Sequence, residues 1–446
     1  MKRSEETIVA CGTARAKSGL AVVRVSGKQA LHVAETVTRQ PVNTQRKMVV
    51  RDLVCPNSGE VIDRCLVVAF FAPNSFTGED VVEFHVHGSL AVIEKTLEII
   101  TALDGCRLAE AGQFTSRAFL NGKMDLTQVE GLGDLIEAET DEQRRQALRI
   151  VDGGLLRTVE KLSDKLSEAL AIMEASLDFA DETDVADDAE KQALVLAAEV
   201  NEDIIRLLTS SKPSETVRNG FRIVLAGPPN VGKSSILNRL AGRDAVIVSD
   251  QAGTTRDLHE IRMTIAGCPA IFIDSAGMRA TMDAIEGEGI RRAKDAMKDA
   301  DLVWWIDDLS VAAEGTFEDD IPANVTTWHV GNKSDIASRG PSRDQESRYF
   351  EISARTGYGF DALTAALKDE ISRSIGRVDD RLVIRSRQFD CLQECQHSIA
   401  EIESLHESEI KAEAMRAALQ AIGRLTGRET SEDILGRIFQ GFCIGK

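Results

Sequence analysis

The sequence predicts a multidomain protein: a mixed α+β N-terminal domain, a helical domain, and a P-loop α/β domain of the Ras-like kind inserted into the helical one. Three observations predict this arrangement. Short strand-like runs dominate residues 1–122, and a strand running into G-x-x-x-x-G-K-S begins at Phe221. Helical spacing of apolar residues flanks that α/β stretch on both sides. At 446 residues the chain has room for several domains of roughly 150 residues.

Composition narrows the class of protein. The content of 43% hydrophobic and 28% charged residues is typical of a globular protein, and no apolar run approaches the roughly 18 residues of a membrane span. The eight cysteines are scattered without zinc-type spacing, which favours a reducing compartment. We therefore expect a cytoplasmic protein with no membrane partner. The net charge of −19 argues against nonspecific coating of nucleic acid but allows a local basic groove.

The N-terminal strands carry one clear alternation, in residues 81–87. Its apolar residues are Val82, Phe84 and Val86. The polar residues between them are Glu83, His85 and His87. One face of this strand should meet a core and the other a polar surface or site. A metal site on the polar face is an alternative, although exposed strand histidines are more often solvated than ligating.

The remaining segments set the predicted domain boundaries. Apolar residues spaced three or four apart indicate a long helix over 155–177 and another over about 190–208, and residues 209–220 read as a linker. Helical spacing returns from about residue 380. The predicted domains are an N-terminal domain (1–122), a helical domain in two parts (123–217 and 377–446) and an inserted G domain (218–376).

The loop after the strand at 221–226 has the composition of a phosphate-binding loop. Backbone N–H groups of residues 230–234 would surround phosphate at a helix N-terminus. Lys233 would reach the β- and γ-phosphates, and the Ser234 hydroxyl would bind Mg²⁺. A glycine-rich turn that matches by chance is the alternative, which the flanking strand and helix oppose.

Four further motifs indicate GTP rather than ATP. Asp274 and Gly277 of D-S-A-G would meet Mg²⁺ through water and the γ-phosphate, and Thr255 of G-T-T-R-D would reach Mg²⁺. Asp335 of N-K-S-D can accept two hydrogen bonds from guanine that adenine cannot donate. The S-A-R motif at 353–355 closes the base pocket. The predicted GTP-binding residues are Asn230, Val231, Gly232, Lys233, Ser234, Ser235, Ser249, Asp250, Gln251, Ala252, Gly253, Thr254, Thr255, Asp274, Ser275, Ala276, Gly277, Asn332, Lys333, Asp335, Ser353, Ala354 and Arg355.

Met278 follows the D-S-A-G motif, where many GTPases place a glutamine that orients the attacking water. Methionine cannot orient water, so either the chain hydrolyses GTP poorly or its catalytic groups come from elsewhere. The Asn230 carbonyl could help to hold a monovalent cation beside the β/γ-bridge, which would supply the charge of an arginine finger. Asn230 as a simple turn-former remains an alternative.

Four blocks of the sequence, three of them outside the G motifs and one around G-T-T-R-D, resemble the MnmE (TrmE) family of tRNA-modifying GTPases. They are F-A-P-N-S-F-T-G-E-D-V-V-E-F-H-V-H-G-S, the segment 112–140, the segment 245–257 and the ending D-I-L-G-R-I-F-Q-G-F-C-I-G-K. The resemblance covers essentially the whole chain, and the final C-I-G-K is among its most specific marks.

The resemblance implies hydrolysis of GTP by paired G domains of a homodimer, with K⁺ promoting their pairing. It implies that K⁺ is held by Asn230, by backbone groups of Ser249 and Gln251, and by Thr254. Asn230 and Lys233 then count as catalytic, and the matching water-orienting acid is Glu286, acting through a bridging water. Glu288 is the alternative, two residues away.

The resemblance also implies that the N-terminal domain forms the dimer and binds 5,10-methylenetetrahydrofolate or 5-formyltetrahydrofolate. The matching residues are Arg24, Glu83, Lys123 and Lys446. Carboxylates pair with a pterin N–H edge, and Lys and Arg pair with a glutamate tail. Cys443 is either a thiolate nucleophile or a small hydrophobe that packs the tail near this site; we favour the second role.

The implied function is tRNA modification. With the FAD-containing partner MnmG (GidA), the protein would place an aminomethyl or carboxymethylaminomethyl group on carbon 5 of the wobble uridine. Folate would give the one-carbon unit, and glycine or ammonium the amine. The alternative is a GTPase switch that binds RNA or ribosomes without chemistry, for which a basic module after the G domain would be expected; the tail from 406 to 436 is mixed in charge.

Overall fold

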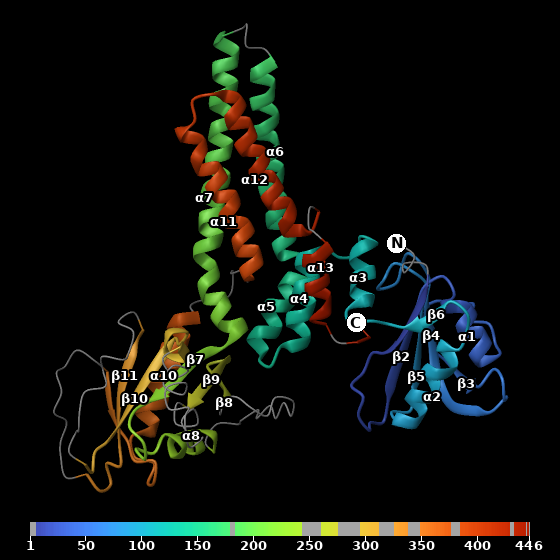
Figure 1. Cartoon of the computed structure of the whole chain (residues 1–446), viewed down its shortest axis with the longest axis horizontal. Coiled ribbons are helices and arrows are strands. Elements are labelled where there is room, and N and C mark those ends of the chain that lie inside the picture. The colour runs from blue at the N-terminus through green and yellow to red at the C-terminus, as the bar shows by residue number, and fades with distance from the viewer. Residues whose placement is uncertain are drawn as a thin grey trace, which may run out of the picture. The chain divides into compact units, whose positions relative to one another are not determined.

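The computed structural model describes residues 6–178, 183–242, 260–274, 295–311, 325–337, 348–375, 384–428, 432–442 and 444–445 (Figure 1). These residues form two compact units. One contains 1–133, 150–201 and 390–446, and the other contains 134–149 and 202–389. Each unit is described by itself.

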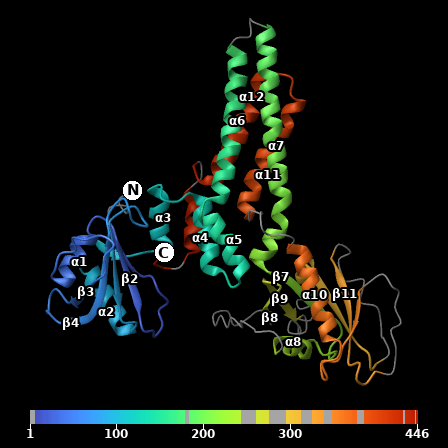
Figure 2. The same ribbon diagram turned by 180° about the vertical axis from the view of Figure 1, so that it is seen from behind.

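The first unit begins with a six-stranded sheet in the order β3-β4-β5-β2-β1-β6. Its strands are β1 Thr7–Cys11, β2 Ala21–Ser26, β3 Val49–Val54, β4 Val61–Phe70, β5 Val81–Val86 and β6 Cys106–Leu108. Neighbours pair antiparallel except β1 and β6, which are parallel. Helices α1 Ala30–Thr38 and α2 Leu90–Thr101 cover one face and bury a common core with it (Figure 2).

The predicted alternation in β5 is confirmed. Val82, Phe84 and Val86 are fully buried, whereas Glu83 and His85 on the other face are half-buried. The strand-like runs of the N-terminal segment, T-I-V-A-C, G-L-A-V-V-R-V-S-G, R-C-L-V-V-A-F-F-A-P and D-V-V-E-F-H-V-H-G, correspond to β1, β2, β4 and β5. The strands β3 and β6 escaped prediction because β3 carries charged residues at its centre and β6 has only three residues, so neither shows a clear period.

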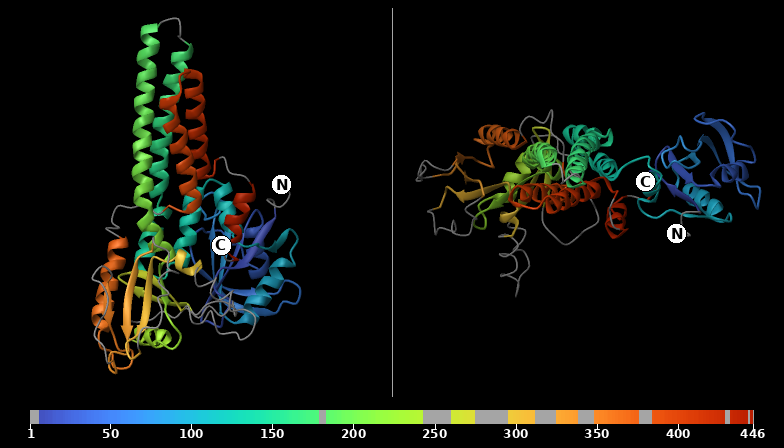
Figure 3. Two further views of the ribbon diagram at one scale, coloured as in Figure 1. Left: turned by 60° about the vertical axis from the view of Figure 1, so that its left-hand side comes forward. Right: turned by 90° about the horizontal axis from the view of Figure 1, so that it is seen from above.

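The helical part of this unit contains α3 Gln113–Leu120, α4 Leu126–Glu137 as far as 133, α6 Gly154–Asp178, the start of α7 Thr183–Asn219, α11 Ser386–Glu401 from 390, η5 Ile402–Ser404, α12 Ser408–Thr426 and α13 Glu432–Gln440. Helices α6 and α12 pack along each other (Figure 3). The predicted helix at 155–177 is confirmed, and most of its apolar stripe is buried, namely Leu155, Val159, Leu162, Leu166 and Met173.

The predicted linker at 209–220 is wrong over most of its length, because α7 continues to Asn219. A polar composition with one proline and a final glycine suggested a linker, but tertiary contacts hold the last turn of the helix. Val217 is fully buried in the core of the second unit. Gln143 Nε2, from α5 Asp141–Val151, donates a hydrogen bond of 3.0 Å to the Arg218 carbonyl at the helix end.

The second unit contains a six-stranded sheet in the order β12-β11-β10-β7-β9-β8. Its strands are β7 Phe221–Ala226, β8 Glu260–Ile265, β9 Cys268–Asp274, β10 Leu302–Asp308, β11 Thr327–Asn332 and β12 Tyr349–Glu351. All pairs are parallel except β8 with β9. Helices α8 Lys233–Ala241 and α10 Phe360–Ile375 share one buried core with the sheet. Parallel strands point their carboxyl ends to the same edge, which is where ligands bind in such sheets.

Candidate nucleotide-binding and folate-binding sites

The loop between β7 and α8 has the backbone conformation of a phosphate cradle. Gly227 and Gly232 have φ angles of 136° and 99°. A Cβ on Gly227 would lie 2.2 Å from the Ile306 carbonyl oxygen, so only glycine fits there. Asn230 also has a positive φ, 64°, which asparagine tolerates better than most residues. The loop thereby presents its N–H groups at the start of α8.

Lys233, Ser234 and Asp274 converge beside this loop. Lys233 is buried, and its Nζ donates hydrogen bonds of 2.8 and 2.7 Å to the carbonyls of Gly227 and Pro228. Its ammonium therefore lies at the mouth of the loop, where it can turn to phosphate oxygens. Ser234 Oγ donates to Asp274 Oδ2 at 2.8 Å. A hydroxyl and a carboxylate at this spacing suit a Mg²⁺ ion that keeps several waters and binds phosphate.

Asn332 joins three of the predicted motifs. Its Nδ2 donates to the Val231 carbonyl of the loop at 2.8 Å, and its Oδ1 accepts from the Ala354 N–H at 3.0 Å. The side chain is 2% exposed. The amide therefore fixes the ends of β7 and β11 and the S-A-R segment relative to one another, which explains the residue type at this position.

The predicted base-recognition residues also come together. Ser353 Oγ donates to Asp335 Oδ1 at 2.7 Å and accepts from the Thr356 N–H at 3.1 Å. Arg355 Nη1 lies 3.9 Å from Asp335 Oδ2. The carboxylate is thus oriented, and it can accept from the two donors of a guanine edge.

Lys333 pairs with Asp308 at the end of β10, a contact that the sequence analysis missed. Burial alone would raise the pKa of Asp308, but hydrogen bonds from Lys333 and Ser310 outweigh burial and lower it. The carboxylate therefore stays ionised and holds the Lys333 ammonium. Asp308 ends β10, and in the parallel pairing it lies opposite Asn332, the first residue of the N-K-S-D motif. An aspartate at the end of the neighbouring strand could therefore have indicated this contact.

Several predicted residues lie outside the described part of the chain. They are the switch residues Ser249, Asp250, Gln251, Ala252, Gly253, Thr254 and Thr255, the motif residues Ser275, Ala276 and Gly277, the acids Glu286 and Glu288, and the tail residues Cys443 and Lys446.

In the N-terminal sheet, Arg24 of β2 lies opposite Glu83 of β5. Arg24 Nε donates to Glu83 Oε1 at 2.8 Å, and its guanidinium lies 5.9 Å from the centre of the Phe76 ring. Lys123, after α3, donates from Nζ to the Pro73 carbonyl at 3.0 Å. Arg24 and Lys123 thus both contact residues 73–76, a segment that leads towards β5.

The end of the chain returns to this sheet. Ile444 forms an isolated β-bridge with Ala111. A Cβ on Gly445 would lie 2.5 Å from the Cys11 carbonyl oxygen, and Gly445 has a φ of 101°. The glycine of C-I-G-K is therefore required by its close approach to the end of β1.

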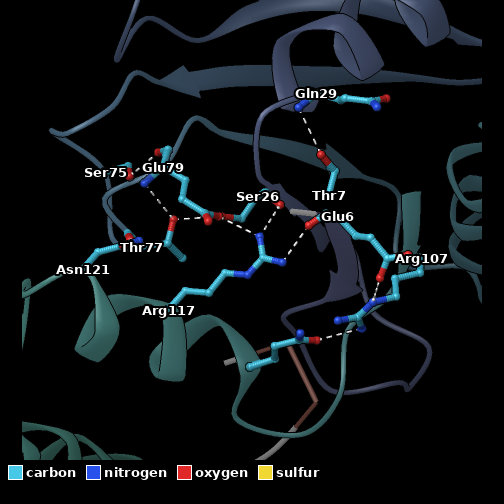
Figure 4. A network of polar contacts seen from close by, with 11 residues as sticks. Glu6, Thr7, Ser26, Gln29, Ser75, Thr77, Glu79, Arg107, Arg117 and Asn121 are labelled. Atoms are coloured by element: carbon cyan, nitrogen blue, oxygen red, sulfur yellow. Dashed lines mark hydrogen bonds and ion pairs between the residues drawn. The ribbon is translucent and has the colours of Figure 1, made fainter. Parts of the chain in front are cut away.

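A buried arginine organises the segment between β4 and β5, and sequence reasoning missed it. Arg117 of α3 donates to the Ser26 and Glu6 carbonyls at 3.1 and 2.7 Å and to Glu79 Oε2 at 2.7 Å (Figure 4). Asn121 Nδ2 donates to the Thr77 carbonyl at 2.7 Å. These bonds fix the segment that Arg24 and Lys123 contact. Arg117, Asn121 and Glu79 all lie inside two of the blocks that resemble the MnmE family, which could have marked them as structurally important.

Glu83, His85 and His87, the polar residues of the alternation at β5, do not converge on one point. His85 Nε2 lies 3.4 Å from Glu83 Oε2, but the ring of His87 turns to Asp63 Oδ1 at 2.7 Å. Burial would raise the pKa of Asp63, but hydrogen bonds from the His87 backbone and ring lower it. Across the described ranges, no group of three His, Cys, Asp or Glu side chains is arranged to hold a metal ion.

The loop between β7 and α8, the Ser234–Asp274 pair and the oriented Asp335 define a guanine nucleotide-binding domain of P-loop type. The family follows from comparison with known proteins. A model of the MnmE helical domain matches residues 126–443, and a model of the GTP-binding protein TrmE N-terminus matches residues 7–123. The chain belongs to the MnmE family of tRNA modification GTPases, as the sequence analysis predicted.

Two relatives illustrate how much of the chain is shared. The tRNA modification GTPase MnmE of Brucella ovis is 42% identical over 446 residues, which span 99% of this chain and 98% of that protein. MnmE of Brucella anthropi is 41% identical with the same coverage. Among solved structures, the FeoB G-domain from Methanococcus jannaschii matches 34% of this chain and 97% of its own at 22% identity and a TM-score of 0.25, too low to add to the assignment.

Within the described ranges, no helix is long and apolar enough to cross a membrane.

Proposed function

We propose that this protein is a K⁺-dependent GTP hydrolase that modifies carbon 5 of the tRNA wobble uridine, acting with an FAD-containing partner, MnmG (GidA). The modification uses a folate one-carbon unit and an amine from glycine or ammonium. The protein works as a cytoplasmic homodimer, with the predicted boundaries 1–122, 123–217, 218–376 and 377–446. The observation that carries the proposal is the Asn332-centred linkage of loop, N-K-S-D and S-A-R motifs in a chain of the MnmE family.

The described residues have distinct roles in GTP hydrolysis. The N–H groups at the start of α8 and Lys233 bind the β- and γ-phosphates. Ser234 would hold Mg²⁺ directly and Asp274 through water, and Thr255, which lies outside the described residues, is the proposed second protein ligand. The ion would supply positive charge for the phosphate oxygens. Asp335 selects guanine. Because β7 and Asn332 are buried and α8 packs its apolar side chains into the same core, these groups are held in place before charge builds up.

The groups that replace the missing glutamine are Asn230 and Glu286. Asn230 is exposed in the loop before α8 with a φ of 64°, so its side-chain carbonyl is accessible to a cation. Asn230, backbone groups of Ser249 and Gln251, and Thr254 would hold K⁺, and the ion would supply the positive charge that an arginine finger supplies elsewhere. Glu286 orients the attacking water through a second water.

The first test is the rate of GTP hydrolysis by the full-length protein in KCl and in NaCl at equal ionic strength. We expect the rate to be about ten-fold or more higher in KCl, since a finger-like charge contributes several powers of ten. Asn230→Ala should remove that difference. Asn238→Ala, which changes an exposed asparagine on α8, is the matched control and should keep it. Equal rates in the two salts would refute the K⁺ mechanism.

The folate site is proposed at Arg24, Glu83 and Lys123, with Lys446. Glu83 pairs with the N–H edge of the pterin, while Lys123 and Lys446 pair with the glutamate tail. The support is the half-buried Arg24–Glu83 pair beside the segment that Arg117 and Asn121 fix. Cys443, which lies outside the described residues, is proposed as a small hydrophobe beside this site.

Glu83→Gln should weaken binding of 5-formyltetrahydrofolate by about ten-fold, because a charge-assisted hydrogen bond contributes about 1.5–3 kcal/mol. Isothermal titration of the full-length protein measures this affinity. GTP hydrolysis should not change. Glu98→Gln, at an exposed carboxylate on α2 that pairs with Lys95, serves as the control. Unaltered folate affinity in Glu83→Gln would rule out the proposed site.

A further inference from the structure

The inserted nucleotide-binding domain is joined to the helices at two places along the chain. The chain enters through the last turn of α7, which ends at Asn219, and continues into β7 at Phe221. It leaves through residues 384 and 385, after which α11 begins at Ser386. Arg218 lies on the entry crossing, and Arg385 lies on the described part of the exit crossing.

Both arginines bind the same carboxylate, that of Asp134 on α4. Arg218 Nε donates to Asp134 Oδ1 at 2.9 Å. Arg385 Nη2 donates to Oδ1 at 2.7 Å, and its Nε lies 3.4 Å from Oδ2. We call these three residues the Asp134 clamp.

The Asp134 clamp is shielded from water, which distinguishes it from ordinary surface ion pairs. The Asp134, Arg218 and Arg385 side chains are 17%, 28% and 24% exposed. Half-buried charge-assisted bonds are strong and fix geometry, whereas exposed pairs contribute little. Without the carboxylate, two like-charged guanidinium groups would face each other, so the two crossings would repel.

Each arginine is rigidly attached to its crossing. The Arg218 carbonyl accepts from Gln143 Nε2, and β7 starts three residues later and runs to the phosphate-binding loop at Gly227. The Arg385 N–H donates to Gln388 Oε1 at 3.0 Å, and its carbonyl accepts from the Phe389 N–H at 2.8 Å. A shift of either crossing must therefore pull on Asp134.

Helix α4 leads from the clamp to the N-terminal part of the chain. It has 12 residues and so spans roughly 18 Å. Asp125 caps its first turn, with Oδ1 accepting from the Thr127 N–H at 2.7 Å. Lys123, a proposed folate-binding residue, lies two residues before that cap. One short, capped helix thus connects the two crossings with Lys123.

We propose that the Asp134 clamp is the coupling element through which nucleotide-dependent movement of the inserted domain reaches α4 and the folate-binding region. Asp134 acts as a positioning residue: it does not touch GTP, and it transmits the position of both crossings to one helix. The inference rests on the proposed function, because it assigns the link between GTP hydrolysis and modification.

Three full-length variants test the clamp: Asp134→Asn, Arg385→Gln and, as a matched control, Asp141→Asn. Asp141 is an exposed carboxylate on α5 that pairs with Arg144 and Arg145. Two activities are measured for each: GTP hydrolysis by the purified protein, and modified wobble uridine in tRNA from cells whose own gene has been deleted. Circular dichroism and the thermal midpoint establish that each variant folds.

We expect Asp134→Asn to keep GTP hydrolysis within about two-fold of the unaltered protein and to lower modified uridine about ten-fold, the usual scale of coupling between sites. Arg385→Gln should likewise keep GTP hydrolysis and lower modified uridine, but by a smaller factor. This variant decides the test if Asp134→Asn does not fold. Asp141→Asn should leave both activities unchanged.

Two results would overturn the clamp. One is normal modification in both clamp variants. The other is a parallel fall of both activities in a folded variant, which would show a purely structural role. Failure of the proposed function has a separate signature: the unaltered gene would then restore no modified uridine in the deleted cells.

Discussion

Gly227→Ala should weaken GTP binding about 100-fold or more, because the new methyl group overlaps backbone that cannot move away. The added Cβ would lie 2.2 Å from the carbonyl oxygen and 3.1 Å from the carbonyl carbon of Ile306. Ile306 is fully buried in β10, between β7 and β11. The φ of 136° adds strain of about 1–2 kcal/mol for any L residue with a side chain.

The measurement is the affinity for a fluorescent GDP or GTP analogue, with the thermal midpoint recorded in parallel. Gly242→Ala is the control, because a Cβ there would meet its nearest neighbours at 3.6 and 3.8 Å and the backbone has a φ of −81°. That variant should bind nucleotide normally. Normal binding in Gly227→Ala would mean that the loop does not hold phosphate in the described conformation.

Asp335→Asn should lower GTP affinity about 1,000-fold and favour XTP instead. The carboxylate accepts two hydrogen bonds from the guanine edge, and each charge-assisted bond contributes about 1.5–3 kcal/mol. An asparagine in its place turns an NH₂ group towards the guanine 2-amino group. Both groups are hydrogen-bond donors, so the bond is lost. Xanthine carries an oxygen there, which the asparagine amide can donate to.

Competition between GTP and XTP for the variant measures this change of nucleotide preference. Binding of XTP by the same sample also shows that the variant is folded. Asp335 is held by Ser353 Oγ at 2.7 Å, which fixes the direction of the new amide as well. If Asp335→Asn still preferred GTP, the base would have to be read by another residue.

The motifs of the nucleotide site could be predicted from sequence because each is local. A phosphate cradle needs a strand, a glycine-rich turn and a helix within about 20 residues, and its chemistry depends on backbone N–H groups and one lysine. The structure places Lys233 Nζ against the loop carbonyls, Ser234 beside Asp274 and Asp335 beside Ser353, as the motif order implied. The switch residues and Glu286 lie outside the described ranges, so their roles stay predictions.

Contacts between distant segments could not be predicted in this way. Arg117 bonds to residues 91 and 111 positions away, and Arg385 bonds to Asp134 across 251 positions. No local period or motif encodes such a pairing. The linker assigned to 209–220 failed for the same reason, since a buried Val217 and the Gln143 bond keep the end of α7 helical.

The sequence alone determined the kind of domains, the nucleotide and the family, because alternation, helical spacing and short motifs report local backbone and local chemistry. Only the tertiary structure decided how those parts are connected. It brought Arg218 and Arg385 to one carboxylate and bound Lys333 to Asp308. The physical reason is that partly desolvated charges need a partner, and the partner is supplied by whichever segment the fold places nearby.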